Sequence, residues 1–67
     1  MSVDLTREQA EQLRDYAAAH GHTVMVTEGV FGRAHTDCTC GFTRVAPSKP
    51  AANRVGLAHA REAVAAL

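Results

Sequence analysis

The chain has 67 residues, which allows one domain, residues 1–67, and excludes a large enzyme. Its seven basic side chains balance its seven acidic ones, which excludes strong non-specific attraction to nucleic acid or anionic membranes. Hydrophobic residues make up 46% of the chain, but many of them are alanines and only 4% of the chain is aromatic. Because such a core rarely stabilises a chain below about 70–80 residues alone, we expect a metal or covalent cross-link to contribute.

A helix is predicted over residues 7–19. Thr6 and Gln9 have the spacing of a capping box at its start. Apolar side chains recur on one face of this segment and charged side chains on the other, and Gly21 is suited to end it. These features indicate an amphipathic helix that packs by one face.

Three strands are predicted next. Residues 22–28 are rich in β-branched side chains, residues 29–32 supply turn signals, and a second strand follows over residues 33–39, which predicts a β-hairpin. A third short strand is expected over residues 42–46. Together the three segments indicate a small antiparallel sheet.

The connection between the second and third strands sets their register. We expect Cys40 and Gly41 to form a two-residue turn. In that register Asp37 lies opposite Arg44, where the two side chains would form a favourable cross-strand ion pair.

A second helix is predicted over residues 49–66. Ser48 can cap it, and Pro50 fits its first turn because the first backbone N–H groups of a helix have no helical partner. His59 lies within the broad apolar face and points toward the core or its edge. The predicted fold class is α+β, with an N-terminal helix, a three-stranded antiparallel sheet and a C-terminal helix. We expect one small zinc-finger-like domain that is cross-linked by one metal site.

The most informative motif is a pair of cysteines. Cys38 and Cys40 are separated by one residue and followed by Gly41, and His59 lies further along the chain. Zinc binds thiolates and imidazoles in a tetrahedron, so this pattern supplies three of four ligands, and Gly41 lets the chain reverse after the second sulfur. We expect one structural Zn²⁺ per chain, although other soft divalent ions also accept these ligands.

Several candidates exist for the fourth ligand. His22 lies beside Cys38 if the hairpin pairs residues whose numbers sum to about 60, and we favour it; a shift of one residue would turn it away. His35 is the alternate: it is closer in sequence, but its odd separation from Cys38 places it on the opposite face of a regular strand. His20, or a water molecule, could also fill the position.

The second half of the chain, residues 33–66, resembles short zinc-binding proteins of actinobacteria and actinophages. Those proteins have a Cys-x-Cys-Gly-aromatic motif followed by an alanine-rich helix with a histidine, matched here by Cys38, Cys40, Gly41, Phe42 and His59. Phe42 stands where tryptophan is usual in such proteins. The resemblance implies a structural zinc ion rather than an activity.

No enzymatic motif is recognisable. A catalytic zinc would keep an open position near a carboxylate, but we expect Glu62 at the polar edge of its helix and Asp37 on the face opposite Cys38. The chain also has no metalloprotease or deaminase motif and no glycine-rich phosphate loop. We therefore expect no catalytic residues and a protein that acts through its surface.

Protein contact is the favoured mode of action. Phe31, at the tip of the predicted hairpin, is suited to a protein partner or to self-association. A nucleic-acid-binding accessory protein is an alternative, through Arg54 and Arg61, but zero net charge and few aromatic residues favour weak or no binding. A metal-free thiol redox pair formed by Cys38 and Cys40 is a further alternative.

A cytoplasmic location without membrane attachment is expected. The first residues lack the basic and apolar segments of a secretory signal, and no stretch approaches the roughly 20 apolar residues of a membrane span. Reducing conditions in the cytoplasm also disfavour a permanent disulfide between the cysteines.

Overall fold

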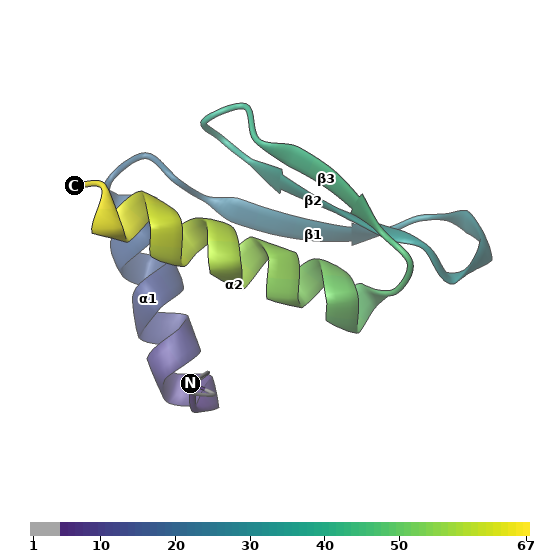
Figure 1. Ribbon diagram of the computed structural model, residues 1–67, viewed down its shortest axis with the longest axis horizontal. Helices are drawn as coiled ribbons and strands as arrows, with labels where there is room; N and C mark the ends of the chain where they lie inside the picture. The colour runs from purple at the N-terminus through teal and green to yellow at the C-terminus, as the bar shows by residue number, and fades with distance from the viewer. Residues whose placement is uncertain (1–4) are drawn as a thin grey trace.

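The computed structural model describes residues 5–67, so residues 1–4 of the predicted domain lie outside the described part. Two helices and a three-stranded antiparallel sheet form the fold (Figure 1). The elements are, in chain order, α1 (Arg7–Ala19), β1 (Val24–Glu28), a 3₁₀ turn (Val30–Gly32), β2 (Ala34–Cys38), β3 (Thr43–Ala46) and α2 (Lys49–Ala65). The predicted α+β class is confirmed, and every predicted helix and strand is present within two residues of its expected bounds.

Local interactions fix where the helices begin. Gln9 N–H donates to the Thr6 hydroxyl oxygen at 3.1 Å and Thr6 N–H donates to the Gln9 side-chain oxygen at 2.9 Å, which completes the capping box. Ser48 accepts a hydrogen bond from Ala51 N–H at the start of α2. Gly21, with a φ of +88°, follows the last turn of α1. Neither helix of residues 5–67 combines the length and apolar character needed to cross a membrane.

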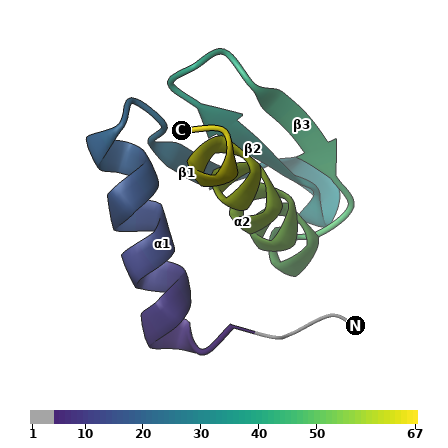
Figure 2. The ribbon, with the colours of Figure 1, turned by 60° about the vertical axis from the view of Figure 1, so that its left-hand side comes forward.

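The sheet has the strand order β1-β2-β3, and α2 packs along one of its faces (Figure 1). Helix α1 packs against α2 rather than against the sheet, as the turned view in Figure 2 shows. The other face of the sheet carries no helix in the described part of the chain. Met25 and Val45 on that face are accordingly 60% and 69% exposed.

The register of β1 and β2 differs from the predicted one by two residues. Val24, not His22, pairs with Cys38. The hairpin turns one residue later than expected, because Gly29 N–H donates to the Arg33 carbonyl oxygen at 2.7 Å across a three-residue loop. Since a shift of two residues preserves the face of every side chain, His22 still lies on the Cys38 side of the sheet.

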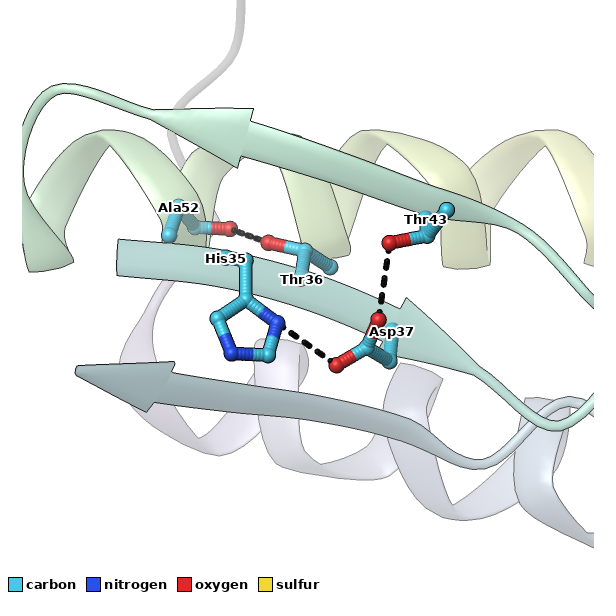
Figure 3. A network of polar contacts seen from close by, with 5 residues as sticks. All are labelled: His35, Thr36, Asp37, Thr43 and Ala52. Carbon is cyan, nitrogen blue, oxygen red and sulfur yellow. Dashed lines mark hydrogen bonds and ion pairs between the residues drawn. The ribbon is translucent and has the colours of Figure 1, made fainter. Parts of the chain in front are cut away.

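The turn between β2 and β3 contains three residues, so the predicted two-residue turn and the Asp37–Arg44 pair are wrong. Gly41, with a φ of +101° that glycine adopts without strain, donates its N–H to the Cys38 carbonyl oxygen at 2.9 Å. Asp37 lies opposite Thr43, whose hydroxyl group donates to the Asp37 carboxylate at 2.8 Å (Figure 3). Arg44 points to the other face of the sheet.

Small buried side chains and the half-buried Val24 and Val26 fill the layer between α2 and the sheet. Thr36 is the largest side chain that is fully buried, and its hydroxyl group donates to the Ala52 carbonyl oxygen of α2 at 2.7 Å (Figure 3). The other buried residues are Ala17, Ala34, Cys38, Ala46, Ala52, Gly56, Ala60 and Ala63. Such side chains bury little apolar surface each, so the hydrophobic stabilisation per residue is small.

Gly56 determines how closely α2 approaches the sheet. A Cβ atom at this position would lie 2.8 Å from Val24 Cγ1 and 3.2 Å from Thr36 Cγ2. Both neighbours are β-branched and stiff at χ1, and Thr36 is also held by its hydrogen bond to α2. A larger residue at position 56 would therefore push α2 away from the sheet.

We expect Gly56→Ala to destabilise the fold by about 1–3 kcal/mol through overpacking. Helix propensity alone favours alanine over glycine by about 1 kcal/mol. The steric clash must therefore cost more than this gain for Gly56→Ala to destabilise the fold. Ala58→Gly, at an exposed position of the same helix, is the matched control for propensity. Denaturant unfolding, monitored by circular dichroism in one buffer, measures the free energy of unfolding of both variants. A Gly56→Ala variant more stable than the wild type would contradict the close contact.

Candidate metal centre

His22, Cys38, Cys40 and His59 come together at one end of the sheet. Cys38 ends β2 and Cys40 lies in the following turn, whereas His22 lies in the loop before β1 and His59 on α2. One ligand atom from each residue, either a sulfur or a ring nitrogen, lies within 4.8 Å of the other three. The four side chains therefore form a cluster that could hold a metal ion.

The distances fit tetrahedral coordination. Cys38 Sγ lies 3.8 Å from His22 Nδ1, and Cys40 Sγ lies 3.4 Å from His59 Nε2. With bonds of about 2.3 Å to sulfur and about 2.0–2.1 Å to nitrogen, a tetrahedral ion holds its ligand atoms roughly 3.3–3.8 Å apart. The other separations among the four atoms are within 4.8 Å, at most about 1 Å beyond this range.

Thr39, between the two cysteines, ties their turn to the loop that carries His22. Its backbone N–H donates to the Thr23 carbonyl oxygen at 3.2 Å, and Thr23 N–H donates to the Thr39 hydroxyl oxygen at 3.0 Å. The same hydroxyl group donates to the Gly21 carbonyl oxygen at 2.9 Å. These three hydrogen bonds hold the backbone of His22 beside the cysteines. Nothing in the spacing of the motif predicts this role; the hydroxyl residue inside the Cys-x-Cys turn is the one sequence signal for it.

Phe42 supports the imidazole of His59. The two rings are stacked, with centroids 4.0 Å apart and planes 11° from parallel. The Arg44 guanidinium lies over the Phe42 ring, 5.4 Å from its centroid. In this arrangement His59 Nε2 is the ring nitrogen nearest to Cys40 Sγ. The sequence places an aromatic residue after the cysteine turn, but the contact with His59 depends on how α2 packs.

The cluster lies at the surface rather than in the core. Cys38 is buried, with 7% of its surface exposed, whereas Cys40 is exposed and both histidines are half-buried. The two cysteines are free, without a disulfide between them. A metal ion bound here would be reached from solvent on the Cys40 side.

The other candidate histidines lie elsewhere. His35 is on the uncovered face of the sheet, where its Nδ1 lies 2.8 Å from Asp37 Oδ2 (Figure 3). The ring of His20 packs against Tyr16, with centroids 4.7 Å apart. Of the two histidines considered first for the fourth position, the fold brings His22 to the cysteines and leaves His35 away from them.

Comparison of the chain with protein-family models, with curated protein sequences and with solved structures gives no match. The fold and the cluster define the class of protein by themselves. It is a small α+β domain with a candidate His₂Cys₂ metal centre between a sheet turn and a helix.

We expect Phe42→Ala to release the His59 ring and to weaken metal binding at the cluster by about 10–100-fold, the range for loss of an outer supporting contact. Phe42→Trp keeps a stacking surface and should retain most of the affinity. Val45→Ala, on β3 but on the uncovered face, is the matched control. Competition with a chromophoric chelator measures the affinities. Equal affinities of Phe42→Ala and the wild type would show that the stack does not position His59.

Proposed function

We propose that this chain is a small, non-enzymatic module whose fold depends on one structural zinc ion bound by Cys38, Cys40, His59 and His22. The observation that carries the proposal is the convergence of four ligand atoms, from three separate parts of the chain, to within 4.8 Å of one another. Two thiolates and two imidazoles are a ligand set that zinc uses in structural sites of small domains.

Zinc is the proposed ion because of the ligand chemistry. Thiolate and imidazole ligands favour Zn²⁺ over Mg²⁺ and Ca²⁺, which take oxygen ligands. Zn²⁺ has no geometric preference from its d electrons and is commonly tetrahedral in structural sites, whereas Co²⁺ binds such ligands less tightly. Metal analysis of the purified protein distinguishes these ions.

A zinc ion would supply stability that the core does not. The buried layer consists almost entirely of alanine, with Gly56, Thr36 and Cys38. Structural zinc sites in small domains contribute about 10–16 kcal/mol of apparent binding free energy at neutral pH. Bound zinc would join the loop before β1, the turn after β2 and α2, so its removal would separate elements that the core holds weakly.

The number of ligands supports a structural rather than a catalytic role. Four protein ligands complete a tetrahedron and leave no position for a water molecule or a substrate. The carboxylates near the motif in sequence are not in the cluster: Asp37 accepts a hydrogen bond from Thr43 on the uncovered face, and Glu62 is exposed on α2. We therefore assign no catalytic residues.

Chelation of the zinc-loaded protein should unfold it, and His22→Ala should prevent stable zinc binding. His35→Ala is the matched control, because His35 belongs to the same hairpin but lies on the opposite face. This control should bind one zinc ion per chain, like the wild type. Native mass spectrometry counts the bound ion, and circular dichroism on the same samples reports folding.

Two outcomes of that experiment would count against the proposal. A chain that stays folded without metal would leave Cys38 and Cys40 as ordinary free thiols, one buried and one exposed, or as a redox pair. Loss of zinc from His35→Ala but not from His22→Ala would mean that His35, and not His22, is the fourth ligand.

Protein contact is the proposed mode of action. Val30 and Phe31 lie at the tip of the hairpin, which extends beyond α2 (Figure 1), and are 73% and 97% exposed. Phe31 also has a φ of +58°, an unfavourable conformation for a bulky residue, which the fold maintains while presenting the ring to solvent. Such exposed apolar groups suit a protein partner or self-association. Nucleic-acid binding through Arg54 and Arg61 is the alternative.

A photo-crosslinking amino acid at position 31 should form protein adducts in cells that produce this chain, because the tip would lie in the interface. The same amino acid at position 58, exposed on α2, is the control and should give fewer adducts. Mass spectrometry identifies the crosslinked species. Adducts with nucleic acid, or stronger protein adducts from position 58 than from position 31, would count against protein contact through the tip.

We also propose a cytoplasmic location. Both cysteines are free, and zinc-binding thiolates persist where the compartment keeps thiols reduced.

A further inference from the structure

The two proposed thiolate ligands differ in accessibility. Cys38 is buried at the end of β2, whereas Cys40 is exposed in the turn. Only Thr39 separates them, and their sulfur atoms lie within 4.8 Å of each other. A reagent from solvent therefore reaches Cys40 first. Cys38 then lies close enough to react with the modified Cys40.

The two sulfur atoms make polar contacts with histidine rings. Cys38 Sγ lies 3.8 Å from His22 Nδ1, and Cys40 Sγ lies 3.4 Å from His59 Nε2. A thiolate is the nucleophilic form of cysteine, and Cys40 is the one of the two that solvent reaches.

We propose that Cys40 is the site at which peroxides oxidise this centre, with Cys38 as the resolving cysteine; this inference rests on the proposed zinc function. The Cys40 thiolate attacks a peroxide oxygen, so that an S–O bond forms, the O–O bond breaks and hydroxide leaves, which gives a sulfenic acid. The Cys38 thiolate then attacks that sulfur, so that an S–S bond forms, the S–O bond breaks and a second hydroxide leaves. The cysteines lose two electrons and the peroxide gains them.

Oxidation would remove two of the four ligands. Because the sulfur atoms of a disulfide are no longer thiolates, His22 and His59 alone would hold the zinc ion, which would leave. The ion joins three parts of the chain across a core of small side chains. Its release would therefore unfold the domain, and the centre would act as a peroxide-sensitive switch between a folded zinc form and an unfolded disulfide form.

Hydrogen peroxide added to the zinc-loaded protein tests this switch. We expect each chain to release its zinc ion and to lose both thiols. The oxidised chain should be lighter than the reduced, metal-free chain by the mass of two hydrogen atoms. A chelating dye follows the zinc, circular dichroism follows the fold, and intact-mass measurement follows the disulfide. Dithiothreitol followed by zinc should restore the folded form.

The order of reaction identifies the attacked cysteine. Limited alkylation of the zinc-loaded wild type should label Cys40 about tenfold faster than Cys38, because the thiolate that solvent reaches reacts first. Trypsin cleaves after Arg33 and Arg44, so both cysteines fall in one peptide. Fragment ions that break on either side of Thr39 separate them.

Two variants separate the roles of the cysteines. Cys40→His keeps four ligands but removes the exposed thiolate, so it should hold zinc in excess peroxide. Cys38→His keeps the exposed thiolate but removes the resolving one, so a sulfenic acid that dimedone traps should accumulate at Cys40. If Cys40→His does not bind zinc, the labelling order in the wild type decides which cysteine is attacked first.

The failure of the switch is distinguishable from the failure of the zinc centre. A wild type that retains zinc in excess peroxide overturns the switch, and a wild type in which Cys38 is labelled as fast as Cys40 overturns the assignment of Cys40 as the attacked cysteine. Both outcomes leave the structural zinc in place. A wild type that binds no metal overturns the proposed function and the switch with it.

Discussion

The close approach of α2 to the sheet is the constraint on which the rest of the structure depends. Gly56 lies against Val24 and Thr36 with no room for a methyl group, and alanines occupy the other buried positions of the helix. The Thr36 hydroxyl group reaches a carbonyl oxygen of α2 because the two layers are this close. A helix with larger residues at these positions would stand further from the sheet, and His59 would not reach Cys40.

This packing links the stability of the domain to its candidate metal centre. Alanine and glycine allow close contact but bury little apolar surface, so the layer that positions the ligands supplies little stability of its own. The same contact brings three parts of the chain to one point. In the proposed zinc form the two features are complementary, because the core sets the distances between the ligands and the ion cross-links the elements that carry them.

Local signals predicted the helices and strands because caps and glycines act over few residues. Thr6 and Ser48 mark the starts of the helices, and Gly21 follows the end of α1. The strand registers could not be predicted in this way, since each depends on the length of a turn. Both turns enclose three residues between paired strands, and the backbone hydrogen bonds of Gly29 and Gly41 show where each turn closes.

The period of a strand explains why His22 faces the cysteines although the predicted register was wrong. A shift of two residues keeps each side chain on its face, whereas the odd separation of His35 from Cys38 places that histidine on the uncovered side. The roles of Thr39 and Phe42 could not be found by this reasoning, because their contacts join segments far apart in the chain. Side-chain parity along the hairpin therefore explains why His22 and not His35 faces the cysteines, and these long-range contacts decide how firmly the ligands are held there.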